Sequence, residues 1–197
     1  DSISQGRSIY SVRKAIGAAL AKESTVPADV VIPVPDSGTP AAIGYAEEAG
    51  VPFELGIIRN HYVGRTFIEP SQNIRNFGVK LKHNANRAEI EGRRVVLVDD
   101  SIVRGTTSKK IVQMVRDAGA TEVHMRIASP PTANPCYYGV DTPSREELMA
   151  ANMDVATMAR QIGVDSLAFI SINGLYQAVG GVDRDGEQPQ YCDACFT

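Results

Sequence analysis

Apolar residues follow two rhythms along this chain, short continuous runs and helical stripes. The runs predict strands at residues 29–34, 53–58, 94–98, 122–128 and 166–170. The stripes predict helices over residues 8–23, 39–49, 106–118, 154–163 and 172–179, and a capping box at Ser144 and Glu147 predicts a further short helix. Strands that alternate with helices favour an α/β fold with a mostly parallel central sheet flanked by helices.

Residues with strong preferences for helix ends mark several of these boundaries. Thr39 is a predicted cap, followed by Pro40 in the first turn and Gly50 at the stop. Asp154 is expected to cap the helix that ends at Gly163. Thr107 or Thr106 is expected to cap the helix after the third strand.

The predicted topology indicates where functional residues gather. Ligands of open parallel sheets bind beyond the carboxyl ends of the strands. The search therefore centres on the residues that follow Val34, Ile58, Val98 and Ala128.

Residues 59–87 interrupt the alternation. They are rich in Arg, Lys and Asn and have little periodicity. A stretch of about 29 residues without clear structure is uncommon inside a compact domain, and it is often functional. We expect a flexible lid; a solvated excursion or two poorly patterned strands are the alternatives.

Composition and charge exclude several classes of protein. The chain has 197 residues, 43% of them hydrophobic and 22% charged, and a net charge of −3. This is ordinary globular composition for a single domain spanning 1–197, with a polar tail at about 183–197. No apolar run approaches the roughly 20 residues of a membrane span, and no secretory signal is visible, so a cytoplasmic location is expected. The mild acidity argues against nucleic acid as a partner.

The three cysteines are the first sign of special chemistry. Cys136 stands alone, whereas Cys192 and Cys195 are separated by two residues. In a cytosolic protein such a pair suggests a metal site or redox chemistry rather than a disulfide.

The segment after Val98 carries the strongest motif. Asp99 and Asp100 follow the strand, and Gly105 with the hydroxyl residues 106–108 then opens a helix. A helix N-terminus offers unpaired N–H groups and a positive dipole end to a phosphate. The acids suit sugar hydroxyls or Mg²⁺. Each feature alone has an ordinary structural explanation, but together they predict a sugar-phosphate site, and neither the P-loop nor the dinucleotide fingerprint is present here.

This segment, VVLVDDSIVRGTTS, closely resembles the 5-phosphoribosyl-1-pyrophosphate (PRPP) loop of type I phosphoribosyltransferases. The order of VIPVPDSGTPAAIGYA (31–46), RNHYVGRTFIEPSQ (59–72) and KLKHNANRAE (80–89) before it is similar to the amidophosphoribosyltransferase family. The resemblance covers essentially the whole chain. It implies the type I phosphoribosyltransferase fold, and the cysteine pattern suggests the iron–sulfur, Bacillus-like branch.

The resemblance implies roles for particular residues. Asp99 and Asp100 would hold the ribose hydroxyls and, with Ser37, the cofactor Mg²⁺. Lys82 and Arg65, within the expected lid, would be catalytic. The implied PRPP-binding residues lie in two loops: Asp36, Ser37, Gly38, Thr39, Asp99, Asp100, Ser101, Arg104, Gly105, Thr106, Thr107 and Ser108.

The implied reaction is transfer of the phosphoribosyl group from PRPP to ammonia, which releases pyrophosphate and gives 5-phosphoribosylamine in the first step of de novo purine biosynthesis. The family draws ammonia from glutamine in an N-terminal glutaminase domain with an N-terminal cysteine. No cysteine lies near residue 1, so we expect the phosphoribosyltransferase half without the glutaminase. The family also implies feedback inhibition by purine nucleotides and a homotetramer.

The iron–sulfur branch binds a [4Fe–4S] cluster through four cysteines. Cys136, Cys192 and Cys195 match three of them, and the fourth would lie upstream of this chain. For three ligands alone, the alternatives are a damaged cluster, zinc with an outside ligand, or an empty site. The simpler alternative is a small apolar Cys136 and a surface cysteine pair.

Two other functions remain as alternatives. A nucleobase-salvage phosphoribosyltransferase shares the loop, but the match over 31–89 does not favour it. A non-catalytic PRPP-sensing regulator usually carries a nucleic-acid-binding domain or a basic face, which a chain of net charge −3 does not suggest.

Overall fold

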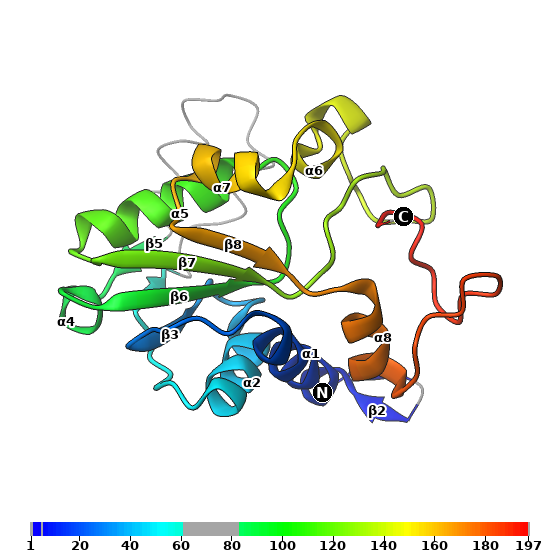
Figure 1. The fold of residues 1–197 in the computed structure, drawn as a ribbon, viewed down its shortest axis with the longest axis horizontal. Helices are drawn as coiled ribbons and strands as arrows, with labels where there is room; N and C mark the ends of the chain where they lie inside the picture. Colours follow the sequence, from blue (N-terminus) through cyan, green and yellow to red (C-terminus); the bar gives the residue numbers. More distant parts are fainter. Residues whose placement is uncertain (1, 5, 61–82, 197) are drawn as a thin grey trace.

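A parallel sheet of four strands forms the centre of the computed structural model, which describes residues 2–4, 6–60 and 83–196. The strand order is β3-β6-β7-β8 (Figure 1). These strands are β3 (Val30–Pro33), β6 (Arg94–Asp99), β7 (Glu122–Ile127) and β8 (Ser166–Phe169). The main helices are α1 (Ile9–Ser24), α2 (Thr39–Ala49), α5 (Thr106–Asp117), α7 (Val155–Ile162) and α8 (Ile172–Gly180). The predicted α/β class and parallel sheet are confirmed.

Shorter elements complete the described part of the chain. They are the hairpin of β1 (Ile3–Ser4) and β2 (Arg7–Ser8), the antiparallel pair β4 (Ile57–Arg59) and β5 (His83–Ala85), and α4 (Arg87–Ile90), η2 (Arg145–Glu147) and α6 (Met149–Asn152). Among the described helices, none is long and apolar enough to cross a bilayer.

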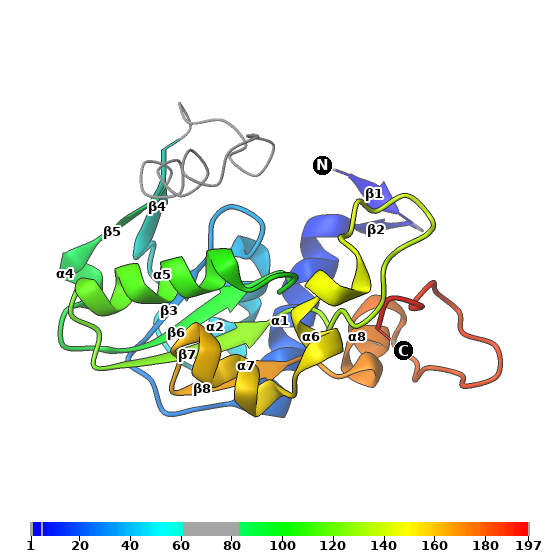
Figure 2. The same ribbon diagram turned by 90° about the horizontal axis from the view of Figure 1, so that it is seen from above.

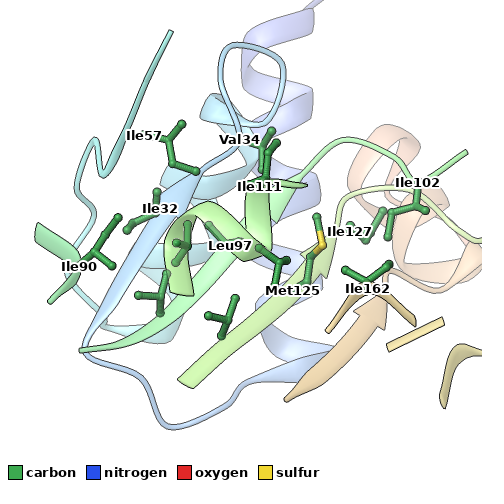
Figure 3. Packing of buried hydrophobic residues seen from close by; sticks show 14 of the residues in the cluster. Ile32, Val34, Ile57, Ile90, Leu97, Ile102, Ile111, Met125, Ile127 and Ile162 are labelled. Atoms are coloured by element: carbon green, nitrogen blue, oxygen red, sulfur yellow. The ribbon is translucent and has the colours of Figure 1, made fainter. Parts of the chain in front are cut away.

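The central strand β6 shows why the sheet is covered on both faces. Val95 and Leu97 belong to one buried cluster, whereas Val96 and Val98 belong to another. Successive side chains of a strand point to opposite faces, so a run that is apolar at every position needs helices on both sides. Each fully buried side chain of this size contributes about 1.5–3 kcal/mol. The first cluster is drawn in Figure 3.

The helices form two layers around the sheet. Helices α1, α2 and α8 cover one face, and α5 and α7 cover the other (Figures 1 and 2). Helices α1 and α2 approach each other closely because Gly17 and Gly44 face the partner backbone. A Cβ on Gly17 would lie 1.8 Å from the carbonyl oxygen of Ala41. This tight packing fixes α2, and with it the turn from which α2 starts.

The predicted strand over 53–58 is present only at Ile57 and Ile58, which belong to β4. Only Phe53 bridges the central sheet, opposite Val31, and β4 pairs instead with β5 outside that sheet. Glu54 and Gly56 interrupt the apolar run, and Leu55 is 57% exposed, so this stretch cannot serve as a strand buried on both faces.

The expected lid over 59–87 overlaps regular elements at its ends. Arg59 ends β4, residues 83–85 form β5, and Arg87 begins α4. The rest of the expected lid, 61–82, lies outside the described residues.

The threonines predicted to cap α2 and α5 lie inside these helices, one or two residues beyond the true caps. The N-cap positions of α2 and α5 are Gly38 and Gly105, so Thr39 and Thr106 are already the first helical residues. Gly105 turns the chain in a left-handed conformation, whereas Gly38 is helical in its angles and lies too close to the Val98 carbonyl oxygen for a side chain to fit. The prediction of Gly50 as the stop of α2 is confirmed by its left-handed conformation.

The capping box at Ser144 and Glu147 is also wrong. The segment forms only the short 3-10 turn η2, and the Glu147 side chain bonds to Arg104 rather than to the backbone of Ser144. In contrast, the predicted cap of α7 is confirmed, because the Asp154 carboxylate accepts a hydrogen bond of 2.7 Å from the Thr157 N–H.

Candidate functional site

The carboxyl ends of β3 and β6 bring two predicted loops into contact. The Val34 N–H donates to the Val98 carbonyl oxygen at 2.8 Å, which continues the pairing of the strands. Gly38 packs against the end of β6, where a Cβ would lie only 2.5 Å from that same Val98 oxygen. The turn 36–39 therefore rests on the strand that carries Asp99, as the parallel topology predicted.

Asp99 is the buried carboxyl group of this site. It is the last residue of β6, is 7% exposed, and accepts a hydrogen bond of 2.9 Å from the Asp100 N–H. Burial, followed by the charge of Asp100, raises the pKa of Asp99 to about 8. The exposed Asp100 accepts from the Ser101 hydroxyl at 3.1 Å. A cation, or hydroxyl groups that donate to the carboxylate, would stabilise the ionised form of Asp99.

The loop after Asp99 leads into an open helix N-terminus. Gly105 adopts a left-handed conformation with φ +71°, and it has no side chain to cap α5. The N–H groups of the first turn are therefore available to an anion, and the helix dipole favours one there. The side chains of Thr106 and Thr107 are exposed beside this turn, whereas Ser108 is buried.

Neighbouring segments hold this loop in place. The Met149 N–H donates to the Val103 carbonyl oxygen at 2.8 Å, and a Cβ on Gly105 would lie 2.5 Å from the Met149 Sδ. The Arg104 Nε lies 2.6 Å from the Glu147 Oε2. Arg104 was predicted to bind PRPP, but in this structure its guanidinium is engaged by Glu147.

A second arginine near the site was missed by the sequence analysis. Arg59, at the end of β4, forms an ion pair with Asp36 of the first turn. This pair brings a positive charge to the turn 36–39, where an anionic group is expected. The predicted catalytic residues Lys82 and Arg65 lie outside the described residues.

The C-terminal tail, which carries Cys192 and Cys195, returns to the loop after β7, which carries Cys136 (Figures 1 and 2). All three thiols are free. The Cys195 carbonyl oxygen accepts hydrogen bonds from the N–H groups of Ala133 (2.9 Å) and Asn134 (3.1 Å). These bonds bring Cys195 to the segment just before Cys136.

The thiols of this cluster differ in their environments. The N–H of Tyr138 lies 3.4 Å from the Cys136 Sγ, and the backbone N–H groups of Tyr138, Val140 and Gly139 lower the pKa of Cys136. Burial raises the pKa of Cys195, and the other two cysteines act electrostatically in the same direction. A thiolate that receives backbone N–H groups is suited to bind a metal.

The acidic site and the cysteine site offer different donor sets. Within the described ranges, no group of three or more His, Cys, Asp or Glu side chains is placed to hold a metal ion, and this includes the three cysteines as they stand. Mg²⁺ is commonly held by one or two carboxylates together with substrate phosphates, and Asp99 and Asp100 fit that requirement. The cysteine site supplies three thiols of the four that an iron–sulfur cluster usually requires.

Comparisons with known proteins agree with this geometry. The chain is 68% identical to the amidophosphoribosyltransferase of Rhizobium etli and 55% identical to that of Bacillus subtilis, in both cases over 100% of this chain. It superposes on the B. subtilis glutamine PRPP amidotransferase complexed with ADP and GMP with a TM-score of 0.89, 55% identity and full coverage of this chain.

The same comparisons define the extent of the match. The chain spans 40–41% of the length of those two sequences and 43% of the superposed structure. The resemblance to amidophosphoribosyltransferases and the predicted type I phosphoribosyltransferase fold are confirmed. Residues 7–139 match the family described as phosphoribosyl transferase domain. The chain therefore belongs to the phosphoribosyl transferase domain family.

Proposed function

We propose that this chain is the phosphoribosyltransferase part of an amidophosphoribosyltransferase. It would transfer the phosphoribosyl group of PRPP to ammonia, release pyrophosphate and give 5-phosphoribosylamine, the first step of purine biosynthesis. The observation that carries the proposal is the contact of the turn 36–39 with the strand end that presents Asp99, next to the open N-terminus of α5. The similarity of the whole chain to enzymes of that name supports it.

Each part of the site suits one part of PRPP. The first-turn N–H groups of α5, with Thr106 and Thr107, would bind the 5-phosphate. Asp99 and Asp100 would accept hydrogen bonds from the ribose hydroxyls. The turn 36–39 would receive the pyrophosphate, close to the charge of Arg59.

Magnesium is part of the proposal. Its oxygen ligands would come from Asp99, Asp100 and Ser37 and from the substrate, and when bound it would neutralise charge that gathers on the departing pyrophosphate.

The proposed chemistry needs no protein nucleophile. The bond between C1 of the ribose and the pyrophosphate oxygen breaks, a bond from C1 to the ammonia nitrogen forms, and the nitrogen gives up a proton. Preorganised positive groups at the leaving oxygen favour this step. Lys82 and Arg65 are proposed to add such charge. The glutamine in the name of the B. subtilis relative suggests glutamine as the ammonia source of the whole protein.

We propose that Cys136, Cys192 and Cys195 are ligands of a [4Fe–4S] cluster whose fourth cysteine lies outside this chain. Their approach in the structure and the N–H groups around the Cys136 thiol support this assignment.

Regulation and assembly are proposed from the relatives. The B. subtilis structure is a complex with ADP and GMP, which supports purine nucleotides as inhibitors here. A homotetramer and a cytoplasmic location complete the proposal.

The test is pyrophosphate release from PRPP and Mg²⁺ by the full-length protein, measured with ammonium at alkaline pH, without ammonium, and with a panel of purine and pyrimidine bases. Release that requires ammonium and ignores every base is the expected result. Release that requires one base would instead assign the site to nucleobase salvage. Absence of release with all acceptors would contradict the proposed activity.

A further inference from the structure

The polar tail, residues 183–196, contains neither helix nor strand and is mostly exposed, yet Asp193 near its end is buried. Asp193, between Cys192 and Cys195, is only 6% exposed, whereas Cys192 is exposed. A buried carboxylate is tolerated only with strong partners. The partners of Asp193 therefore determine the position of the two cysteines beside it.

Two side chains from outside the cysteine pair bind Asp193. The Tyr176 hydroxyl, on α8, lies 2.9 Å from the Asp193 Oδ2 and 3.1 Å from the Tyr191 carbonyl oxygen. Arg184 forms an ion pair with the same carboxylate, with its Nη2 3.4 Å from the Oδ1.

The anchor on α8 is itself rigid. Tyr176 is 2% exposed, and its ring meets the Tyr191 ring edge-on with 5.4 Å between the centroids. On the other side, the Cys195 carbonyl oxygen is held by Ala133 and Asn134. The cysteine pair is thus fixed at Asp193 to a helix and at Cys195 to the segment that precedes Cys136.

We propose that Arg184, Asp193 and Tyr176 form a clasp that positions Cys192 and Cys195 as ligands opposite Cys136. This inference rests on the proposed cluster and deepens it. The three residues act through the position of the cysteines and donate no ligand themselves. Partners that orient metal ligands typically change metal affinity by about 10- to 100-fold when they are removed.

The clasp also fixes the conformation of the tail, which has no helix or strand of its own. A chain segment without regular structure has a large conformational entropy, and metal binding must overcome it before the thiols converge. With the clasp closed, the segment that carries Cys192 and Cys195 is already ordered, and less of this entropy remains to be overcome. The clasp therefore favours a bound metal group over the open tail.

The experiment uses the full-length protein with Asp193→Asn, which keeps the shape but removes the charge, and Tyr176→Phe, which removes one hydroxyl. Asp183→Asn is the matched control, because Asp183 lies in the same tail but is exposed, and its carboxylate accepts a hydrogen bond from the Gln177 side chain. Each protein is reconstituted anaerobically with ferrous iron and sulfide, and iron release to a chelator is followed. Release is expected to be about 10- to 100-fold faster in both clasp variants and unchanged in the control.

A second readout needs no metal. In the metal-free proteins, alkylation of Cys192 and Cys195 is timed by peptide mass spectrometry, with PRPP binding as the check that the domain is folded. We expect about tenfold faster alkylation of the half-buried Cys195 in the clasp variants than in the wild type or Asp183→Asn, since a hydrogen bond to a charged group is lost.

The outcomes separate the clasp from the cluster. If the wild type holds iron and the clasp variants release it at the wild-type rate, the clasp is overturned and the cluster stands. If the wild type takes up no iron, the cluster proposal fails, and the alkylation rates decide the clasp: faster modification supports it, and equal rates overturn it. Should Asp193→Asn not fold, the milder Tyr176→Phe provides the same decision.

Discussion

The site at the strand ends and the cysteine-bearing tail are built in opposite ways. At the strand ends, the backbone does most of the positioning: parallel pairing, a helix start and two glycines place Asp99 and the turn 36–39. In the tail, a single buried carboxylate and its two partners do the positioning. Backbone changes should therefore disturb the first region most, and single side-chain changes should disturb the second.

The largest effect is expected for Gly38→Ala. The new Cβ would lie 2.5 Å from the Val98 oxygen and 2.8 Å from the Val34 oxygen, and both are backbone atoms that cannot move aside easily. We expect a loss of about 3 kcal/mol in the free energy of unfolding, measured by urea denaturation, together with weaker PRPP binding.

The matched control for that substitution is Gly186→Ala in the tail, where a Cβ meets nothing within 4 Å. Its free energy of unfolding should stay within about 0.5 kcal/mol of the wild type. Equal losses in the two variants would contradict the difference drawn between the two regions.

Tyr176→Phe should have the next largest effect on stability, and this effect should be confined to the C-terminal tail. The Asp193 carboxylate loses a hydrogen-bond donor, which destabilises the closed tail by about 1.5 kcal/mol. Hydrogen exchange should show faster exchange of amides in residues 183–196 and unchanged exchange in β6. A uniform increase across the sheet would mean that the tail and the domain open as one unit.

Glu147→Gln should change PRPP affinity little, although it breaks the ion pair between Glu147 and Arg104, in the loop before α5. The Arg104 and Glu147 side chains are 51% and 52% exposed, and exposed pairs contribute about 0.2–1 kcal/mol. PRPP affinity, measured by calorimetry, should change by no more than about threefold. A much larger loss would show that side chains, and not the backbone, hold this loop.

The smallest effect on stability is expected for a substitution of Asp29, which bonds to Arg94 at the opposite end of the sheet. The Arg94 side chain lowers the pKa of Asp29 from 3.8 to about 2. Because the folded-state pKa is the lower one, the pair stabilises the protein above the unfolded pKa and loses its contribution as the pH falls through the folded value.

Thermal unfolding of the wild type and Asp29→Asn tests this sign. The wild type should have a slightly higher midpoint at neutral pH, and the difference should vanish as the pH approaches about 2. A difference that grows on acidification would contradict the assigned direction of the shift.

The periodic parts of the fold could be predicted from the sequence. Strands β3, β6, β7 and β8 and the helices around them follow from runs and stripes, because burial on two faces imposes apolar residues at the four interior positions of β6, 95–98. The contact of the turn 36–39 with Asp99 followed from parallel topology alone. The end of the central sheet near 53–58 could not be predicted, since apolar content did not reveal that β4 pairs with β5.

Pairs between distant side chains were the other part that the sequence did not reveal. Glu147 was interpreted as a helix-capping residue, yet it bonds to Arg104, which is 43 positions away. Asp193 is 17 positions from Tyr176 and carries no periodic signal. Such pairs depend on how loops pack in three dimensions, which local patterns do not encode. The position of Asp193 between two cysteines was the only signal in the sequence that could have drawn attention to it.

The most direct test of the PRPP site is a calorimetric titration of the wild type and of the double variant Asp99→Asn with Asp100→Asn, with PRPP in the presence of Mg²⁺. Circular dichroism would confirm that the variant is folded. The assignment predicts that affinity falls by at least about tenfold, because the variant loses its charged acceptors for the ribose hydroxyls and for magnesium. Equal affinities in the two proteins would contradict the placement of PRPP at the end of β6.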